Sequence, residues 1–456
     1  MTSTARVDSA RGWVVVGAAA LATFTIFGIT YSFGTAFHAI ADEFGAGKGA
    51  VAFMFGVVIF FLFVLSLPAG RLSDRIGPRP VMVVGATSMG VGLWLTSVVH
   101  NLNLAYATYG LGVGISAACC YVPMVAQVSA WFVRRRAAAL GLASAGIGLG
   151  TLVGPKITKR LIESQGWRPT FRILAVFGAV ALGVATVLAA RAPGSQGAVR
   201  PTLKSIIAIS AFRRLYLSGL LMGLGLFVPF VFLAPYAEDR GISGGNASWL
   251  VSLLGLGSLS GRLVLSALAG RLGLGRLYRL CVLVMGLSFV LWLVAGSSFV
   301  MLGAFAVLLG LAYGGYVALS PAVSAQLFGL VGLAGILGAL YTSSGIGGLV
   351  GPPLAGWLID TTGSYYTAVA MAIGLFAGAV IALPPLDAAP SAAPVATAPA
   401  ATVLLGPVGS AAAESANGWA PATNGAHRPA VPLAPSAVAR PVLAPAVAGC
   451  PPFLSW

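Results

Sequence analysis

Arg262 is the most informative charged residue, because it stands inside an apolar run near residues 248 to 268. If Trp249 to Leu268 form a membrane-spanning helix, Arg262 lies six residues from one end, about 9 Å deep at ~1.5 Å per residue. An arginine at that depth costs roughly 3 kcal/mol or more unless it faces a cavity or a partner. Its planar guanidinium matches a carboxylate in bidentate geometry, so we expect Arg262 to bind one. The alternative is that the side chain extends to the lipid headgroups beside Arg271 and Arg276.

Aromatic hydroxyls and one histidine could complete such a site. Tyrosines in the apolar runs combine a hydrogen-bonding tip with an apolar wall, as a small organic anion requires, and the candidates are Tyr31, Tyr121, Tyr313 and Tyr316. No Asp or Glu lies well inside any run, which leaves His38 as the candidate for proton coupling, since imidazole changes charge near neutral pH. The alternatives are packing for each tyrosine and a hydrated interfacial position for the histidine.

The elements that must position these residues are membrane-spanning helices. The 456 residues are 58% hydrophobic and only 8% charged, whereas soluble domains have roughly 25% charged residues. Runs of about 20 apolar residues, the length that crosses a bilayer, follow one another almost to residue 385. The expected spans are 13–38, 50–70, 79–99, 103–128, 137–157, 171–190, 215–236, 248–268, 277–296, 299–323, 333–357 and 365–385. The sequence therefore predicts an all-α membrane protein with twelve transmembrane helices.

An internal repeat divides these helices into two pseudo-symmetric bundles of six. Four segments recur in the same order at an offset of about 200 residues; for example, Val153-Gly154-Pro155 returns as Val350-Gly351-Pro352. Parallel halves of this kind are typical of transporters that work by alternating access. The expected organisation is an N-terminus 1–12, a bundle 13–190, a linker 191–214, a bundle 215–385 and a disordered Ala/Pro-rich tail 386–456.

The distribution of basic residues predicts the orientation in the membrane. With the N-terminus inside, 19 of the 26 Lys and Arg residues face the cytoplasm, so we expect a multi-pass cell inner-membrane protein with both termini cytoplasmic. The net charge of +16 then reflects topology and predicts no nucleic-acid partner. Lys156, Lys159 and Arg160 fall at the opposite end, where they either attract anions or extend to the headgroups.

Motifs for other kinds of chemistry are absent from the sequence. The glycine runs lack the strand before them and the Gly-Lys-Ser/Thr ending of a phosphate loop, which argues against an ATP-driven pump. There is no His-Glu-x-x-His or Gly-x-Ser-x-Gly motif, and the three histidines and four cysteines form no ligand cluster. We therefore expect no catalytic residue, no metal, no cofactor and no enzymatic activity.

The loop after the second span carries a family motif. Its residues Gly70, Arg71, Asp74, Arg75, Gly77 and Arg79 resemble the pattern of the major facilitator superfamily. The resemblance implies that the acid and the arginines form contacts between helices in one access state that break in the other, which is a conformational latch. The alternative is simple anchoring by positive charge on the cytoplasmic side.

A closer resemblance is to the monocarboxylate transporter and oxalate/formate exchanger branch. It rests on Tyr31 to Gly34, Trp131 to Arg136, Gly166-Trp167-Arg168 and Asp360 to Tyr365. The resemblance implies that an arginine in the eighth span contacts substrate and that the four candidate tyrosines lie in cavity-lining spans. The chain departs from these families by having Ser258 four residues before Arg262, no lysine near residues 31–37 and no charge in 333–357. One buried cation balances one carboxylate better than two, which favours a monoanion over oxalate.

These residues together predict a secondary active transporter of a small organic anion, a monocarboxylate, in which Arg262 binds the carboxylate. Its expected partners are that anion, the lipid bilayer, and protons or a counter-transported anion. Two alternatives stay open at this point. One is an efflux carrier for an apolar or cationic compound, and the other is a non-transporting membrane sensor.

Overall fold

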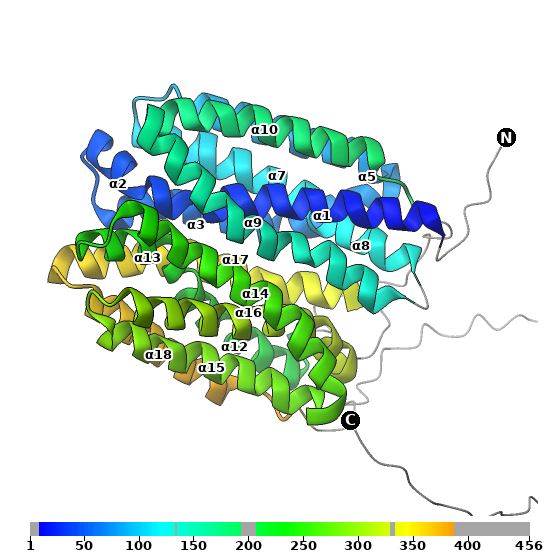
Figure 1. Ribbon diagram of the computed structural model, residues 1–456. Helices are drawn as coiled ribbons and strands as arrows, with labels where there is room; N and C mark the ends of the chain where they lie inside the picture. The colour runs from blue at the N-terminus through cyan, green and yellow to red at the C-terminus, as the bar shows by residue number, and fades with distance from the viewer. Residues whose placement is uncertain (1–8, 133–134, 193–206, 329–332, 387–456) are drawn as a thin grey trace, which may run out of the picture. The chain divides into compact units, whose positions relative to one another are not determined.

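The computed structural model of the protein describes residues 9–132, 135–192, 207–328 and 333–386 (Figure 1). They belong to one compact unit that spans Met1–Ala396. Residues 1–8, 133–134, 193–206 and 329–332, and residues 387–456 of the predicted tail, lie outside the described part. All elements assigned in the described part are helices.

The first half of the chain contains six membrane-crossing segments, several of which are made of more than one helix. They are α1 (Ala10–Tyr31) with α2 (Phe33–Phe44); α3 (Lys48–Val64) with α4 (Ser66–Ile76); α5 (Pro78–Thr96); α6 (Leu102–Ala105), η1 (Tyr106–Leu111), α7 (Gly112–Cys120) and α8 (Val122–Trp131); α9 (Arg136–Gln165); and α10 (Trp167–Leu188).

The second half repeats this order. Its segments are α12 (Ser210–Leu226) with α13 (Val228–Asp239), α14 (Gly244–Leu272), α15 (Leu274–Ala295), α16 (Phe299–Phe328), α17 (Leu333–Thr362) and α18 (Tyr365–Ala382). The predicted twelve transmembrane helices are confirmed, because each described segment corresponds to one predicted span.

The packing within each half follows the same pattern. Helix α1 packs along α9, as Figure 1 shows, and α12 packs along α17 at the repeated position. The pair α5 and α10 corresponds in the same way to α15 and α18. Between the halves, α3 packs on α17 and α14 packs on α9, which exchanges the two halves as a pseudo-twofold axis requires. The structure is thus two pseudo-symmetric bundles of six segments.

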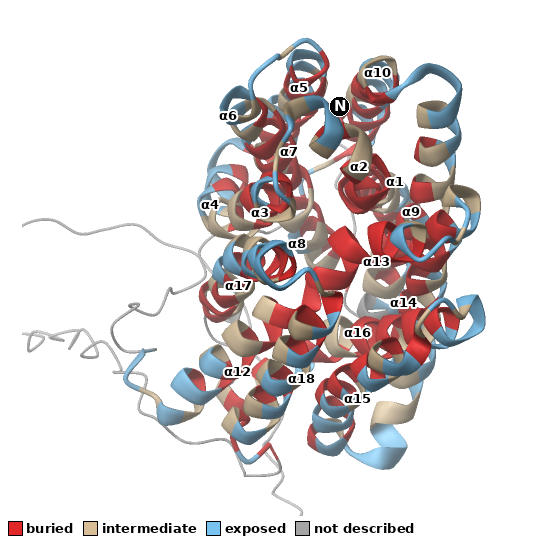
Figure 2. Ribbon diagram, turned by 90° about the vertical axis from the view of Figure 1, so that its left-hand side faces the viewer, coloured by how far each residue is buried: buried red, intermediate tan, exposed pale blue. Residues whose placement is uncertain are grey.

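Length and apolar character agree with a membrane environment. In the described ranges nine helices are long and apolar enough to cross a bilayer, and the pair α3 and α4, bent by 43°, makes a tenth. The two other segments, α5 and α17, complete the repeat with 19 and 30 residues. Figure 2 shows buried residues on the helix faces that meet one another and exposed residues at the outer faces. Exposed large side chains such as Val180, Val187 and Leu287 would face lipid.

Several spans are longer than predicted and are interrupted. The first span covers Ala10–Phe44 rather than 13–38, with a break at Ser32. The Ser32 hydroxyl donates to the Gly28 carbonyl at 2.6 Å, a contact that competes with the helical hydrogen bonds and bends helices. At the break between α3 and α4, Pro68 occupies the first turn of α4, where its missing amide proton is tolerated.

Glycines let the paired helices approach closely at repeated positions. A Cβ atom on Gly154 would stand 2.5 Å from the Gly28 carbonyl oxygen, and one on Gly351 would stand 2.1 Å from the Leu224 carbonyl oxygen. Neither distance is sterically allowed for a side chain, so these helix pairs require glycine. In a membrane, where lipid is as apolar as the protein, this close packing drives helix association.

Candidate functional site

Arg262 lies in the interior, on the part of α14 that packs between α9 and α16, and only 3% of the residue is exposed. Helix α14 continues to Leu272 instead of ending at Leu268. Arg262 is therefore ten residues, or about 15 Å, from that end, rather than about 9 Å. The extension is favoured by Arg271, because a basic residue in the last turn complements the helix dipole.

The guanidinium of Arg262 is only partly satisfied. Its Nε donates to the Ser258 hydroxyl at 3.4 Å, and its Nη1 donates to the Ser144 carbonyl of α9 at 3.2 Å. Nη2 is shielded from solvent and makes no hydrogen bond with any described residue. None of the described carboxylates forms a salt bridge with Arg262. The side chain is thus a buried cation whose Nη2 group can still donate hydrogen bonds.

Tyr31 and Tyr313 bridge the two bundles beside this arginine. Tyr31 is 1% exposed, and its hydroxyl lies 3.2 Å from the hydroxyl of Tyr313 on α16. The ring of Tyr31 also stacks on Phe230 of α13, with ring centroids 4.1 Å apart. Arg262 lies close enough to act electrostatically on the Tyr31 phenol.

Two further tyrosines also lie close to Arg262. One is Tyr121, whose ring packs edge-on against Phe27 with centroids 5.2 Å apart. The other is Tyr341 of α17, whose ring centroid lies 5.8 Å from that of Phe63 across the bundle interface. Sequence reasoning missed Tyr341. Its position two residues before the repeated Ser343-Ser344-Gly345 segment was the available signal.

Tyr316 is a neighbour of Tyr313 rather than of Arg262. Its ring packs against Tyr278 of α15 with centroids 5.1 Å apart, and it lies close to Tyr313. The structure therefore brings Tyr31, Tyr121 and Tyr341 close to Arg262, with Tyr313 in contact with Tyr31 and Tyr316 close to Tyr313.

Aromatic contacts between the bundles continue from this level toward the α13–α14 turn. Phe55 of α3 faces Phe227 at 6.2 Å between centroids, and Phe37 of α2 faces Phe232 of α13 at 5.3 Å. Both phenylalanines of the second pair are fully buried. These rings separate Arg262 from the end of the protein where α13 ends and α14 begins.

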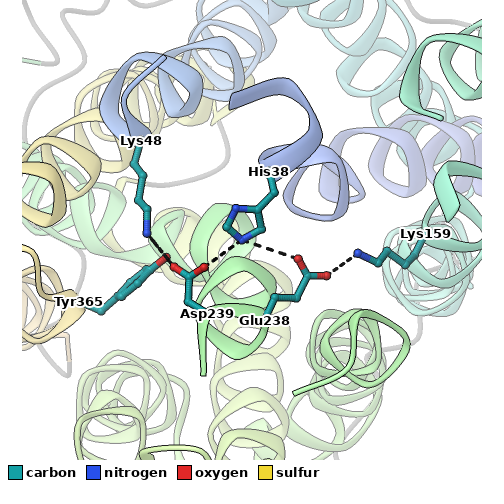
Figure 3. Close-up of polar contacts among 6 residues, drawn as sticks. All are labelled: His38, Lys48, Lys159, Glu238, Asp239 and Tyr365. Carbon is teal, nitrogen blue, oxygen red and sulfur yellow. Dashed lines mark hydrogen bonds and ion pairs between the residues drawn. The ribbon is translucent and has the colours of Figure 1, made fainter. Parts of the chain in front are cut away.

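At that end, polar side chains of both bundles meet (Figure 3). We call these residues the interbundle cluster: His38, Lys48, Lys159, Glu238, Asp239 and Tyr365. Lys48 donates to Asp239 at 2.8 Å and to the Tyr365 hydroxyl at 2.7 Å. Lys159 donates to Glu238. The cluster joins α2, α3 and α9 of the first bundle to α13 and α18 of the second.

His38 lies at this end, on α2, and not near Arg262. Its Nε2 is 3.3 Å from an Asp239 oxygen and 3.7 Å from a Glu238 oxygen. Neither acid was recognised from the sequence, because a carboxylate at the last residues of a helix resembles an ordinary interfacial residue. The basic group at 156–160 is engaged as well: Lys159 pairs with Glu238, and the Lys156 ammonium lies 4.1 Å over the Trp249 ring.

Asp360 adds a second polar link at the same end. Its two carboxylate oxygens accept the backbone N–H groups of Lys48 and Gly49, each at 3.1 Å. These amides open α3, so a carboxylate of α17 caps a helix of the opposite bundle. The motif Asp360 to Tyr365 therefore contributes contacts between the bundles.

Residues 70–79 lie at the opposite end of the bundle, and the predicted loop is wrong, because α4 continues to Ile76 and α5 begins at Pro78. Gly77 separates α4 from α5 and has φ +94°, a backbone conformation that residues other than glycine rarely adopt. Arg79 donates from Nε to the Ala189 carbonyl at 2.8 Å and from Nη2 to the Val187 carbonyl at 3.0 Å, which caps the C-terminus of α10. Arg191 donates to the Asp74 carbonyl. Gly70, Arg71 and Arg75 lie on the last turns of α4, with both arginines exposed.

Two pseudo-symmetric bundles of transmembrane helices are an arrangement found in membrane transporters. No cluster of metal-ligand type occurs in the described ranges. Residues 19–216 and 215–450 each match the Major Facilitator Superfamily, and the chain belongs to this family.

The relatives are transporters and not enzymes. The chain is 33% identical over 380 residues to human monocarboxylate transporter 11, covering 78% of this chain and 79% of the relative. It is 28% identical over 396 residues to monocarboxylate transporter 12-B of Danio rerio, covering 78% and 83%. The MFS-type transporter pynF of Aspergillus niger is 30% identical over 363 residues, covering 78% and 83%.

Solved structures support the fold. A bacterial homologue of the human lysosomal transporter Spinster aligns with TM-score 0.62 at 14% identity, covering 82% of this chain and 96% of the other. The nucleoside transporter NupG aligns with TM-score 0.65 at 12% identity, covering 82% and 100%. The chain is thus a multi-pass membrane transporter that resembles the monocarboxylate transporter branch.

Proposed function

We propose that the protein transports a small organic anion, a monocarboxylate, by alternating access, and that Arg262 binds the carboxylate. The bundles 13–190 and 215–385 rock against each other around this residue, with both termini in the cytoplasm and the interbundle cluster facing outside the cell membrane. The relatives named as monocarboxylate transporters support the substrate class. Coupling is by protons or by exchange for a second anion.

The unsatisfied Nη2 of Arg262 is the observation that carries the proposal. A buried charge without a counter-charge loses several kcal/mol of hydration, and a bound carboxylate would offset that loss through charge-assisted hydrogen bonds. With Nη1 directed to Ser144 and Nε to Ser258, the free donor is left to the ligand.

The neighbouring phenols fit the same ligand. Tyr31, Tyr121, Tyr313 and Tyr341 supply hydroxyl donors for the second carboxylate oxygen, while their rings supply apolar contact for the rest of the molecule. Tyr316 lies close to Tyr313. A single cation with neutral donors favours a monoanion over a dianion.

Thermal unfolding of the purified protein with lactate, pyruvate, benzoate and oxalate tests the proposal. A ligand at about 100 times its Kd stabilises the native state by about 2.7 kcal/mol and raises the Tm. We expect a monocarboxylate to stabilise the wild type and the Arg271→Ala control, whose exposed arginine lies on the same helix, but not Arg262→Ala.

Two results would count against this function. If Arg262→Ala keeps the full carboxylate-induced shift, the arginine is structural. If only apolar or cationic compounds stabilise the wild type, the proposed substrate class is wrong and the alternative of a carrier for such compounds is favoured.

A further inference from the structure

His38 has an unusual environment for a histidine near the end of a membrane helix. Its Nε2 atom is shielded from solvent and has no hydrogen bond with any described residue. Yet carboxylate oxygens of Asp239 and Glu238 lie 3.3 and 3.7 Å from this atom (Figure 3). A protonated ring in this place would bring a positive charge to two negative groups at once, whereas a neutral ring would bring none.

Other charged groups also lie around α2. Helices α1, α3, α9, α10 and α13 pack against α2. The titratable and charged groups near this end belong to these helices, to α2 itself, and to the adjoining α17, α18 and α13–α14 turn. They are Tyr31, Asp42, Glu43, Lys48, Lys156, Lys159, Arg160, Glu163, Arg168, Arg172, Tyr236, Glu238, Asp239, Arg240, Asp360, Tyr365 and Tyr366. Of these, only Glu238 and Asp239 form ion pairs with His38.

Several of these groups have partners of their own. Arg168 pairs with Glu43 at 2.7 Å, and Arg172 donates to Ser97. The Arg240 guanidinium lies over the rings of Tyr236 and Tyr366, at 5.3 and 5.5 Å. In the described structure the ion-pair partners of His38 are therefore the two carboxylates of α13.

Those two carboxylates are held in place from the opposite bundle. Lys159 of α9 binds Glu238, and Lys48 of α3 binds Asp239 at 2.8 Å. Each acid thus already joins the bundles, and His38 of α2 provides a third point of attachment between the two lysines. The first bundle can keep this end closed with or without a proton on His38, but the closure is stronger with it.

The location of His38 limits what the proton can do. The side chain is 32% exposed at its own end of the protein, while the buried Phe37–Phe232 and Tyr31–Phe230 pairs lie between it and Arg262. Arg262 is 18 residues, or about 27 Å, into α14 from this end. A proton on His38 is therefore exchanged with the compartment at the closed end.

We propose that His38, Glu238 and Asp239 form a proton-binding site that closes the α13–α14 end of the carrier, so that acid on this face favours the state closed here. The inference rests on the proposed alternating access, and it adds regulation by pH from one face of the membrane. His38 is then a regulator of the access equilibrium rather than a group that carries protons past the substrate.

Distance measurements between spin labels test this site without a substrate. Labels on cysteines introduced at the exposed positions Ala50 and Asn246 report the separation of the bundles at this end, in full-length protein whose native cysteines are replaced by alanine. In lipid nanodiscs between about pH 8 and pH 5, we expect the ratio of short to long distances to rise about tenfold, the effect of one charge-assisted hydrogen bond.

Matched variants assign the effect to His38. We expect His38→Gln to abolish the pH dependence while both distances remain populated, and Glu238→Gln with Asp239→Asn to reduce it with His38 intact. His100→Gln is the control, because His100 is exposed and forms no ion pair with a described residue; it should behave as wild type.

The outcomes separate this inference from the proposed function. A pH response that persists in His38→Gln, or no pH response in the wild type, overturns the proton-binding site even if carboxylates bind. If the response follows His38 while no carboxylate stabilises the protein, the site stands and the proposed substrate class fails.

Discussion

The hydroxyl oxygens of Tyr31 and Tyr313 lie 3.2 Å apart and join α1 of the first bundle to α16 of the second. The pair lies close to Arg262, and the Tyr31 ring also stacks on Phe230. A ligand that binds the guanidinium would contact these hydroxyls. The same pair of residues would then contact the ligand and connect the two bundles. This arrangement links binding to the rocking motion in the proposed mechanism.

Tyr313→Phe should weaken carboxylate binding without unfolding the protein. Loss of one neutral hydrogen bond costs about 1 kcal/mol, so we expect the Kd to rise about fivefold. Titration of the carboxylate by tryptophan fluorescence or calorimetry measures the change. Tyr109→Phe is the control, because the Tyr109 hydroxyl is buried and makes no hydrogen bond with a described residue. Equal effects of the two variants would show that Tyr313 contributes packing alone.

Gly154→Ala should destabilise the protein, because its Cβ would stand 2.5 Å from the Gly28 carbonyl oxygen. Overpacking of this kind costs about 1 to 3 kcal/mol, and we expect a lower Tm in detergent. Gly183→Ala is the comparison, since no atom lies within 4 Å of the position its Cβ would take. An unchanged Tm for Gly154→Ala would mean that α1 and α9 can separate at little cost.

Asp360→Ala should release the first turn of α3. The carboxylate accepts the amides of Lys48 and Gly49, and loss of a helix cap costs about 1 kcal/mol. Hydrogen exchange at these amides should become about fivefold faster, while Asp42→Ala, an exposed acid on α2 that forms no salt bridge in the described structure, should change nothing. Unchanged protection would indicate that other groups satisfy the amides.

The helices and their repeat could be predicted because the bilayer imposes a strong constraint. A span needs about 20 apolar residues, and the repeated Val-Gly-Pro segment marks the same helix in both halves. Arg262 could be singled out for the same reason, since a charge is conspicuous in an apolar run. Its depth was underestimated because the span was taken to end at Leu268, whereas α14 continues to Leu272, with Arg271 in its last turn.

The polar contacts between the bundles could not be predicted. Lys48 and Asp239 are separated by 191 residues, and nothing in the local pattern of either residue points to the other. Tyr341 was missed because a tyrosine in an apolar run has the same pattern whether it packs or binds. His38 was chosen for its ability to titrate, but its partners Glu238 and Asp239 depend on how α2 meets α13.

Exchange of a radiolabelled carboxylate in proteoliposomes tests the central claim most directly, using the monocarboxylate that gives the largest thermal stabilisation. We expect Arg262→Ala to abolish exchange and Arg262→Lys to keep a small fraction, because an ammonium retains the charge but lacks the bidentate geometry. Arg271→Ala should exchange at the wild-type rate. Wild-type exchange by Arg262→Ala would contradict the account, since the carboxylate would then be bound by some other group.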